Sequence, residues 1–399
     1  MDLPLPRGTH LVHIGPQKTG TTSLQGAFHK NRMALAEHGV HYAGPTRQPR
    51  AAAAAVTLGK VLPGHPADSP DKWPALVKEV RGSTAERVVI SAEMFANAEP
   101  AAARTIIDDI GGDHPHVVIT LRPLARLLSS MWQQQVQGKL RLSYDEWLQA
   151  IFADTVTTSN ARTFWRRHRQ VSTSNARTFW RRHRHDALAR RWADVVGADN
   201  VTAIVLDERD RNMTFRTFEQ LLCLPTGILV PDDQNNRSLS LPEAEMLREL
   251  NRQYDQRGWP QALYARALKR MLVFLRERPL PPDEPRITTP TWAAERADDV
   301  AVKIQEGLAA SGVNIIGDLA NLRVPVTNSD ATNEVETVPI DAAARAVIGA
   351  FEQTQIRPQE AFAHGPGAHV SADAPSTGQI LRTVAGHVKT RVRTRRGQR

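Results

Sequence analysis

The chain has 399 residues, 41% of them hydrophobic, and a formal net charge of +9 at pH 7. A chain of this length and composition can bury a substantial core, and its single cysteine, Cys223, excludes an intramolecular disulfide framework. No apolar run approaches the roughly eighteen residues that span a bilayer, and none of the 14 histidines has a metal-ligand spacing such as His-Glu-x-x-His.

The positive charge is concentrated in two segments. Residues 151–191 contain ten arginines against two aspartates, and residues 380–399 contain six arginines and one lysine with no acidic residue. The rest of the chain is therefore mildly acidic. Because one cysteine fits a reducing compartment and no signal peptide is predicted before the first strand, we expect a cytoplasmic protein.

The first predicted elements are a short apolar strand at residues 11–14, a loop, and a helix that ends near Gly39. The loop contains Lys18, Thr19, Gly20, Thr21, Thr22 and Ser23. A helix N-terminus leaves N–H groups unpaired and carries partial positive charge, so it is suited to binding an anion. Gly20 allows close approach of the backbone, and the hydroxyl groups add donors. The sequence predicts a phosphate-binding loop here.

Two alternatives exist for this loop. Gly15 and Gly20 have the spacing of the nucleoside-triphosphate motif G-x-x-x-x-G-K-[ST], but Thr21 stands where that motif needs lysine. A triphosphate site requires the lysine at the helix entrance, and here Lys18 lies inside the loop. The other alternative is an ordinary glycine and threonine turn between a strand and a helix.

The next predicted strand, from Val88, ends at the carboxylate of Glu93, after an alanine-rich segment at 51–80 that prolines interrupt. Ligands of open parallel sheets bind beyond the carboxyl ends of the strands, so Glu93 is expected to face the same crevice as Lys18. It is our candidate general base. A helix cap or a salt bridge would also explain a glutamate at this position.

A third buried strand, Val117 to Leu121, leads into Arg122, Pro123 and a helix that contains Ser130. Pro123 suits the first position of a helix. Seven residues are almost two turns, so Ser130 returns to the face where the helix begins. Arg122 and Ser130 are thus placed to hold one anion between them, although a surface salt bridge would equally explain the arginine.

The first basic segment contains an exact duplication: Thr158–Arg169 recurs letter for letter as Thr173–Arg184. Two identical copies do not make a repeat fold, which needs at least three units. No glycine or proline occurs from Lys139 to Val196, so the region can be largely helical, and fifteen residues leave the copies about 60° apart on one helix. We expect one copy to occupy the structural position and the other to bulge out or to lengthen a helix.

The remaining pattern predicts further elements in chain order. These are a helix at 187–196, a strand at 201–206, a helix at 215–224, a capping stretch before a helix at 243–254, a proline-rich linker at 278–291, and a helix from 292 followed by an apolar stretch at 313–316. Beyond residue 325 the periodicity fades, and 365–399 is typical of a disordered basic tail. We therefore divide the chain into a domain at 8–325 and a poorly ordered extension at 326–399.

The loop from Lys18 to Ser23 and the Arg122 and Ser130 pair together resemble the two donor-binding motifs of sulfotransferases, enzymes that use 3′-phosphoadenylyl sulfate (PAPS). The resemblance is to the bacterial type and extends over residues 8–325. It implies an α/β, P-loop-like three-layer fold, with a parallel sheet and helices on both faces. It also implies that the loop holds the 5′-phosphosulfate and that Arg122 and Ser130 hold the 3′-phosphate.

The same resemblance implies in-line transfer of a sulfuryl group to a hydroxyl of a carbohydrate, a lipid or a small molecule, without a metal. Lys18 would neutralise charge on the bridging oxygen, and Glu93 would take the acceptor proton. The glycine-rich C-terminal motif of the cytosolic enzymes is missing, and Asn236 and Ser238 belong to a segment that would lie near the 3′-phosphate.

Two other classes of function remain open from the sequence. One is a P-loop nucleotide kinase or hydrolase, which the position of Lys18 disfavours. The other is a non-catalytic protein that binds nucleic acid through its basic segments, where Phe164, Trp165, Phe179 and Trp180 alternate with arginines. We do not expect nucleic acid to be a partner, because a solvated helical face explains the arginines as well.

Overall fold

The structure is a computed structural model that describes residues 4–59, 71–153, 173–231, 237–326 and 333–355. Its centre is a six-stranded sheet in which every pairing is parallel, in the order β2-β3-β1-β4-β5-β6. The strands are β1 (Thr9–Gly15), β2 (Val40–Tyr42), β3 (Arg87–Ser91), β4 (His114–Leu121), β5 (Val201–Val205) and β6 (Asn314–Ile316). This confirms the predicted α/β class.

The strand order places a topological switch point beside β1. After β1 the chain builds β2 and β3 on one side of it, and then crosses to β4 on the other side. The connections therefore diverge at the carboxyl ends of β1 and β4, where a crevice opens in folds of this kind. The loop with Lys18 follows β1, and Arg122 follows β4.

Alternate residues of each central strand enter different cores, because successive side chains point to opposite faces of a sheet. Leu11 of β1 packs with Phe28 and Phe218, whereas its neighbour Val12 packs with Trp132 and other residues of the larger core. Both faces of the sheet are thus covered, as the predicted three-layer arrangement requires.

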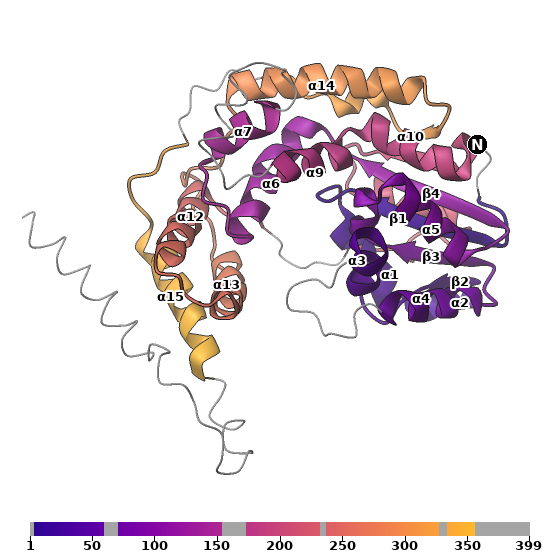
Figure 1. Cartoon of the computed structure of the whole chain (residues 1–399), viewed down its shortest axis with the longest axis horizontal. Helices are drawn as coiled ribbons and strands as arrows, with labels where there is room; N and C mark the ends of the chain where they lie inside the picture. Colours follow the sequence, from indigo (N-terminus) through magenta and orange to yellow (C-terminus); the bar gives the residue numbers. More distant parts are fainter. Residues whose placement is uncertain (1–3, 60–70, 154–172, 232–236, 327–332, 356–399) are drawn as a thin grey trace, which may run out of the picture. The chain divides into compact units, whose positions relative to one another are not determined.

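Three helices cover the smaller core: α1 (Thr21–Lys30), α2 (Arg32–Glu37) and α11 (Met213–Leu221). The larger core involves α3 (Arg50–Leu58), α4 (Lys72–Arg81), α5 (Pro100–Ile110), α6 (Leu124–Gln137), α7 (Tyr144–Ala153), α9 (Thr173–His183), α10 (His185–Val196), α12 (Leu241–Gln256), α13 (Gln261–Arg276) and α14 (Thr291–Ala309). Figure 1 shows α14 lying alongside α10 and α7. Among the described residues, no helix is long and apolar enough to cross a membrane.

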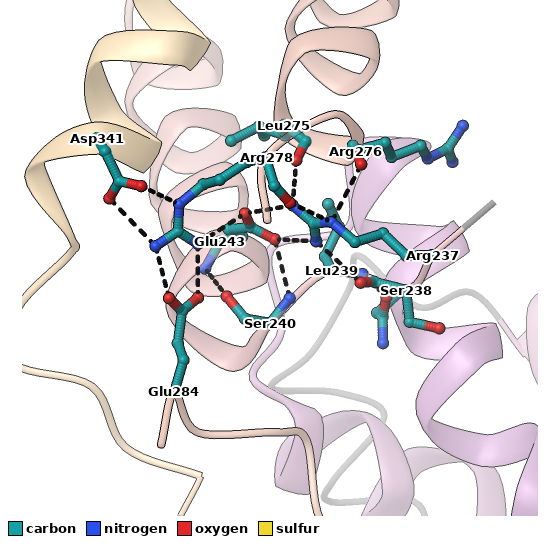
Figure 2. A network of polar contacts seen from close by, with 11 residues as sticks. Arg237, Ser238, Leu239, Ser240, Glu243, Leu275, Arg276, Arg278, Glu284 and Asp341 are labelled. Carbon is teal, nitrogen blue, oxygen red and sulfur yellow. Dashed lines mark hydrogen bonds and ion pairs between the residues drawn. The ribbon is translucent and has the colours of Figure 1, made fainter. Parts of the chain in front are cut away.

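Helices α12, α13 and α15 (Ile340–Gln355) are joined by a network of ion pairs, drawn in Figure 2. Arg278, only 2% exposed, contacts Glu243 of α12 at 3.2 Å, Glu284 at 2.6 Å and Asp341 of α15 at 2.5 Å. Ser240 caps α12 in a reciprocal pair of hydrogen bonds with Glu243. The predicted capping stretch before this helix is therefore confirmed.

Some elements of the fold differ from our expectations. Strand β2 and helix α13 were not predicted, since three residues of β2 carry no pattern and the α13 sequence was not recognised as periodic. Helix α15 also lies in the segment beyond residue 325 that we expected to lack regular structure, and it packs on α13 through Arg270 and Glu352. The tail at 365–399 lies outside the described residues, and the domain boundary stays a prediction.

The second copy of the duplicated segment forms α9, while the first copy lies outside the described residues. Phe179 is buried, and the indole N–H of Trp180 donates to the Ile151 carbonyl at 2.9 Å. These two aromatic residues pack within the protein, so they do not form the exposed stacking surface that a nucleic-acid site requires.

Candidate functional site

A cavity of about 550 Å³ lies at the carboxyl ends of β1 and β4. Its lining contains eight of the nine residues that the sequence singled out: Lys18, Gly20, Thr21, Thr22, Ser23, Glu93, Arg122 and Ser130. Residues more than a hundred positions apart in the chain thus meet at one place.

The loop after β1 turns sharply before α1 begins at Thr21. Gly20, the residue before the helix, has φ 80°, a left-handed conformation that side chains disfavour. Lys18 also has a positive φ of 69°, which is uncommon for a residue other than glycine. The cavity therefore faces the N-terminus of α1, where unpaired N–H groups attract anions.

Thr19 is the predicted residue that does not line the cavity. Its hydroxyl is fully buried and donates to the Pro16 carbonyl at 2.7 Å, and it also shares a hydrogen bond of 2.7 Å with Thr120 of β4. The Thr19 hydroxyl is thus paired within the protein and anchors the loop to the sheet, and a role of Thr19 in binding the donor stays a prediction.

A row of buried, hydrogen-bonded polar side chains lies next to the loop after β1. His13 of β1 contacts Ser91 of β3 at 2.8 Å and Thr120 at 3.3 Å, and Gln25 of α1 donates to Ser91 at 3.1 Å. Complete burial lowers the pKa of His13 to about 3, so the ring is neutral at physiological pH. These hydrogen bonds link α1 to β3, β1 and β4, and they were not predicted from the sequence.

Lys18 is a half-buried cation whose ammonium has no hydrogen-bond partner among the described residues. Burial lowers its pKa, the Glu93 carboxylate opposes that shift, and the positive charge of Arg276 adds to it. An anion bound beside Lys18 would offset both the cost of burying the ammonium and its repulsion by Arg276. The local electrostatics therefore favour a negatively charged ligand.

Glu93 begins a short 3-10 turn, η2 (Glu93–Asn97), directly after β3. One of its carboxylate oxygens accepts a hydrogen bond from the Thr21 hydroxyl at the start of α1. It lines the cavity together with Lys18, so a carboxylate and an ammonium face the same space. This pairing suits proton transfer next to a site where negative charge is stabilised.

Arg122 lines the cavity and is also held by the protein. Its guanidinium donates to Glu208 at 2.6 and 2.9 Å and to the Lys18 carbonyl at 3.2 Å. Arg126, one turn into α6, reaches the same carboxylate at 3.6 Å. Arg122 therefore both lines the cavity and forms a salt bridge with Glu208, as the alternative explanation supposed. A bound anion would have to compete with the Glu208 carboxylate for Arg122.

Ser130 belongs to a polar stripe on α6. Ser130, Gln133, Gln134 and Gln137 have helical spacing and all line the cavity. Gln133 also accepts from the backbone N–H of Leu239 at 3.0 Å, which ties the segment before α12 to this wall. The spacing of the three glutamines was a signal that the sequence analysis did not use.

Arginines that the sequence analysis missed line another part of the cavity: Arg47, Arg237 and Arg276. Arg237 is neutralised by Glu243, with two contacts of 2.8 Å. In Figure 2 the Arg276 guanidinium extends away from that network, and it has no hydrogen-bond or ion-pair partner in the described part of the chain. Burial, and then the nearby Arg237, lower the pKa of Arg276.

A second cavity of about 460 Å³ adjoins the first and shares Gly20, Ser23 and Arg122 with it. Its remaining lining includes apolar side chains beyond β5, those of Leu206, Phe215 and Pro231. Asp207, Glu208 and Asp210 also line the second cavity, so it combines apolar side chains with acidic ones, whereas the first cavity is lined mainly by cations and neutral polar groups.

Ser238 lines the first cavity, whereas Asn236 lies outside the described residues. Over the described ranges, no cluster of three or more histidine, cysteine or acidic side chains could hold a metal ion.

Comparison with known proteins gives one similarity. No protein-family model matches the chain, and no curated protein matches it. Among solved structures, the chain is similar to a sulfotransferase from Alicyclobacillus acidocaldarius, with 18% identity and a TM-score of 0.37 over 64% of this chain and 98% of the other.

Proposed function

We propose that the chain is a PAPS-dependent sulfotransferase that transfers a sulfuryl group to a hydroxyl acceptor. The observation that carries the proposal is the convergence of the loop at 18–23, Glu93, Arg122 and Ser130 on one cavity. The excess of positive charge in its lining fits a donor that carries several negative charges.

The residues divide into donor-binding and reacting groups. The α1 N-terminus and the hydroxyls of Thr22 and Ser23 would hold the 5′-phosphosulfate, and Arg122 with Ser130 would hold the 3′-phosphate. The apolar side chains of Leu206, Phe215 and Pro231 in the second cavity suit the adenine base. Bound PAPS supplies an activated sulfuryl group and a phosphate leaving group.

The transfer would require two charge movements that this site can support. Glu93 would accept the proton of the acceptor hydroxyl as its oxygen bonds to sulfur, and Lys18 would stabilise the charge on the bridging oxygen as the sulfur–oxygen bond breaks. Within the described lining the other side chains are mostly polar, with Leu239 the one large apolar residue and no aromatic ring. This favours a polar acceptor such as a carbohydrate over a lipid or a phenol.

The test is calorimetric binding of 3′,5′-adenosine diphosphate, ADP and ATP without magnesium, to the wild type, Arg122→Ala and Arg126→Ala. We expect selective binding of the 3′-phosphorylated nucleotide, reduced about tenfold or more in Arg122→Ala because a charge-assisted contact is lost. Arg126 is the matched control, since it contacts Glu208 but does not line the cavity. Preference for ATP, or equal loss in both variants, would contradict the proposal.

A further inference from the structure

The duplicated segment has a structural connection to the site. Arg182 belongs to the second copy, in α9, and its counterpart in the first copy is Arg167. The two arginines have identical neighbours from nine residues before to two residues after. The local sequence therefore gives no reason to expect different roles for Arg167 and Arg182.

Arg182 joins two of the segments that form the cavity. Its guanidinium donates to the Gln17 side-chain oxygen at 3.0 Å and to the Asn97 side-chain oxygen. Gln17 precedes Lys18 in the loop after β1 and lines the cavity. Asn97 ends the turn that begins with Glu93. One side chain thus connects the loop after β1 with the turn after β3.

The charge of Arg182 also acts on this part of the site. Burial lowers the pKa of Arg182 to about 10, while the Glu93 carboxylate opposes the shift. The group therefore stays protonated near neutral pH. Arg182 itself does not line the cavity, so its influence on a ligand would pass through Gln17 and Glu93.

Helix α9 is itself held firmly against the turn and the core. Phe179 packs edge-on against Trp147, with ring centroids 5.9 Å apart. Arg181 forms an ion pair with Glu99 at 2.5 Å. Arg191 of α10 donates to the Ala96 carbonyl of the turn at 3.0 Å and to the Arg181 carbonyl of α9 at 3.2 Å. These contacts fix where α9 places the Arg182 side chain.

We propose that Arg182 is a positioning residue of the sulfotransferase site, and that the second copy of the duplicated segment is the one that supplies it. The inference rests on the proposed function. Arg182 would hold Gln17 and the η2 turn together, so that Lys18 and Glu93 keep the separation that transfer requires. A displacement of about 1 Å at such a site can cost about 100-fold in rate.

The experiment compares full-length Arg182→Ala, Arg182→Lys and Arg167→Ala with the wild type. Arg167 is a matched control, because it is the same residue in the same local sequence. Three quantities are measured: hydrogen exchange at residues 15–20 and 93–97, affinity for 3′,5′-adenosine diphosphate, and hydrolysis of PAPS with water as the acceptor.

In Arg182→Ala we expect faster exchange in both segments and hydrolysis slowed about 10- to 100-fold, with affinity changed less than about threefold. Arg182→Lys should recover most of the rate, since an ammonium supplies the same charge and can donate to one of the two amides. Arg167→Ala should match the wild type.

Equal behaviour of Arg182→Ala and Arg167→Ala would overturn the inference, and so would a lysine variant as slow as the alanine variant. A wild type that does not bind 3′,5′-adenosine diphosphate would instead remove the sulfotransferase assignment. The exchange comparison would then still decide whether Arg182 holds the loop to the turn.

Discussion

At the scale of single residues, the site combines cations of two kinds. Arg122 and Arg237 are already paired with carboxylates, whereas Lys18 and Arg276 have no ion-pair partner among the described residues. A paired arginine binds an anion only by sharing or losing its partner. When an unpaired, partly buried cation binds an anion, the attraction offsets the free-energy cost of having removed the cation from water. For the proposed anionic donor, we therefore expect the unpaired cations Lys18 and Arg276 to contribute most of the affinity, and the paired arginines less.

Replacing Lys18 by alanine should reduce turnover of PAPS more than affinity for the desulfated nucleotide. The lysine is proposed to stabilise charge that develops only during transfer, which predicts a loss of about 100- to 1000-fold in kcat. Turnover and calorimetric affinity are measured beside Lys30→Ala, an exposed lysine at the end of α1. Equal losses in rate and affinity would argue against the transition-state role.

Replacing Glu208 by alanine should raise affinity for 3′,5′-adenosine diphosphate about three- to tenfold. The change releases Arg122 from its 2.6 Å ion pair and removes a negative charge beside the 3′-phosphate position. Calorimetry is compared with Glu249→Ala, which breaks an exposed ion pair on α12. Weaker binding in Glu208→Ala would mean that the carboxylate orients Arg122 rather than competing for it.

At the scale of elements, the packing of α12, α13 and α15 determines where the unpredicted arginines lie. Arg237 donates to the backbone carbonyls of Arg276 and Arg278 at 3.2 and 3.0 Å, so it fixes the end of α13. Because Arg276 is the last residue of α13, its position at the cavity depends on these hydrogen bonds. Arg237 and Arg276 therefore reach the cavity from the segment before α12 and from the end of α13, which lie outside the sheet.

Replacing Arg278 by alanine should destabilise this helical group strongly. The change leaves the nearly buried Glu284 without its ion-pair partner and leaves the fully buried Glu243 with Arg237 alone, and breaking a buried pair costs about 3–5 kcal/mol. Chemical denaturation of this variant is compared with Arg252→Ala, an exposed arginine of α12. A loss no larger than that of Arg252→Ala would show that the network does not stabilise the fold.

Much of the secondary structure was predictable from the sequence. Four of the six strands, the capping of α12 and the helix of α14 follow from apolar runs and capping residues within a few positions. Helix α13 escaped prediction although Tyr264, Leu268, Met271 and Leu275 are buried at helical spacing. That pattern was present in the sequence and was not used.

At the scale of the whole molecule, buried histidines make the fold sensitive to acid. Burial lowers the pKa of His13 to about 3 and of His116 and His185 to about 4, and it lowers the pKa of His183 well below its usual range. In the unfolded chain these rings take up protons near pH 6.5. Between these limits the unfolded state binds more protons, so stability falls as pH decreases.

We expect the free energy of unfolding to be highest above pH 6.5 and to fall below it, by up to about 1.4 kcal/mol per pH unit for each buried histidine. Urea denaturation between pH 8 and pH 4 measures the slope. His116→Gln should reduce it and His114→Gln, an exposed neighbour, should not. A slope unchanged by His116→Gln would show that this ring is not buried neutral in solution.

The sequence by itself determined the loop at 18–23, the carboxylate at the end of β3 and the spacing of Arg122 and Ser130. These depend on residue types within about ten positions of one strand end, where backbone geometry alone sets the placement. Only the tertiary structure decided the pairing of the Thr19 hydroxyl with Thr120 and the position of Arg276 at the cavity. Each of these depends on contacts between segments that are far apart in the sequence, which no local pattern of residue types encodes.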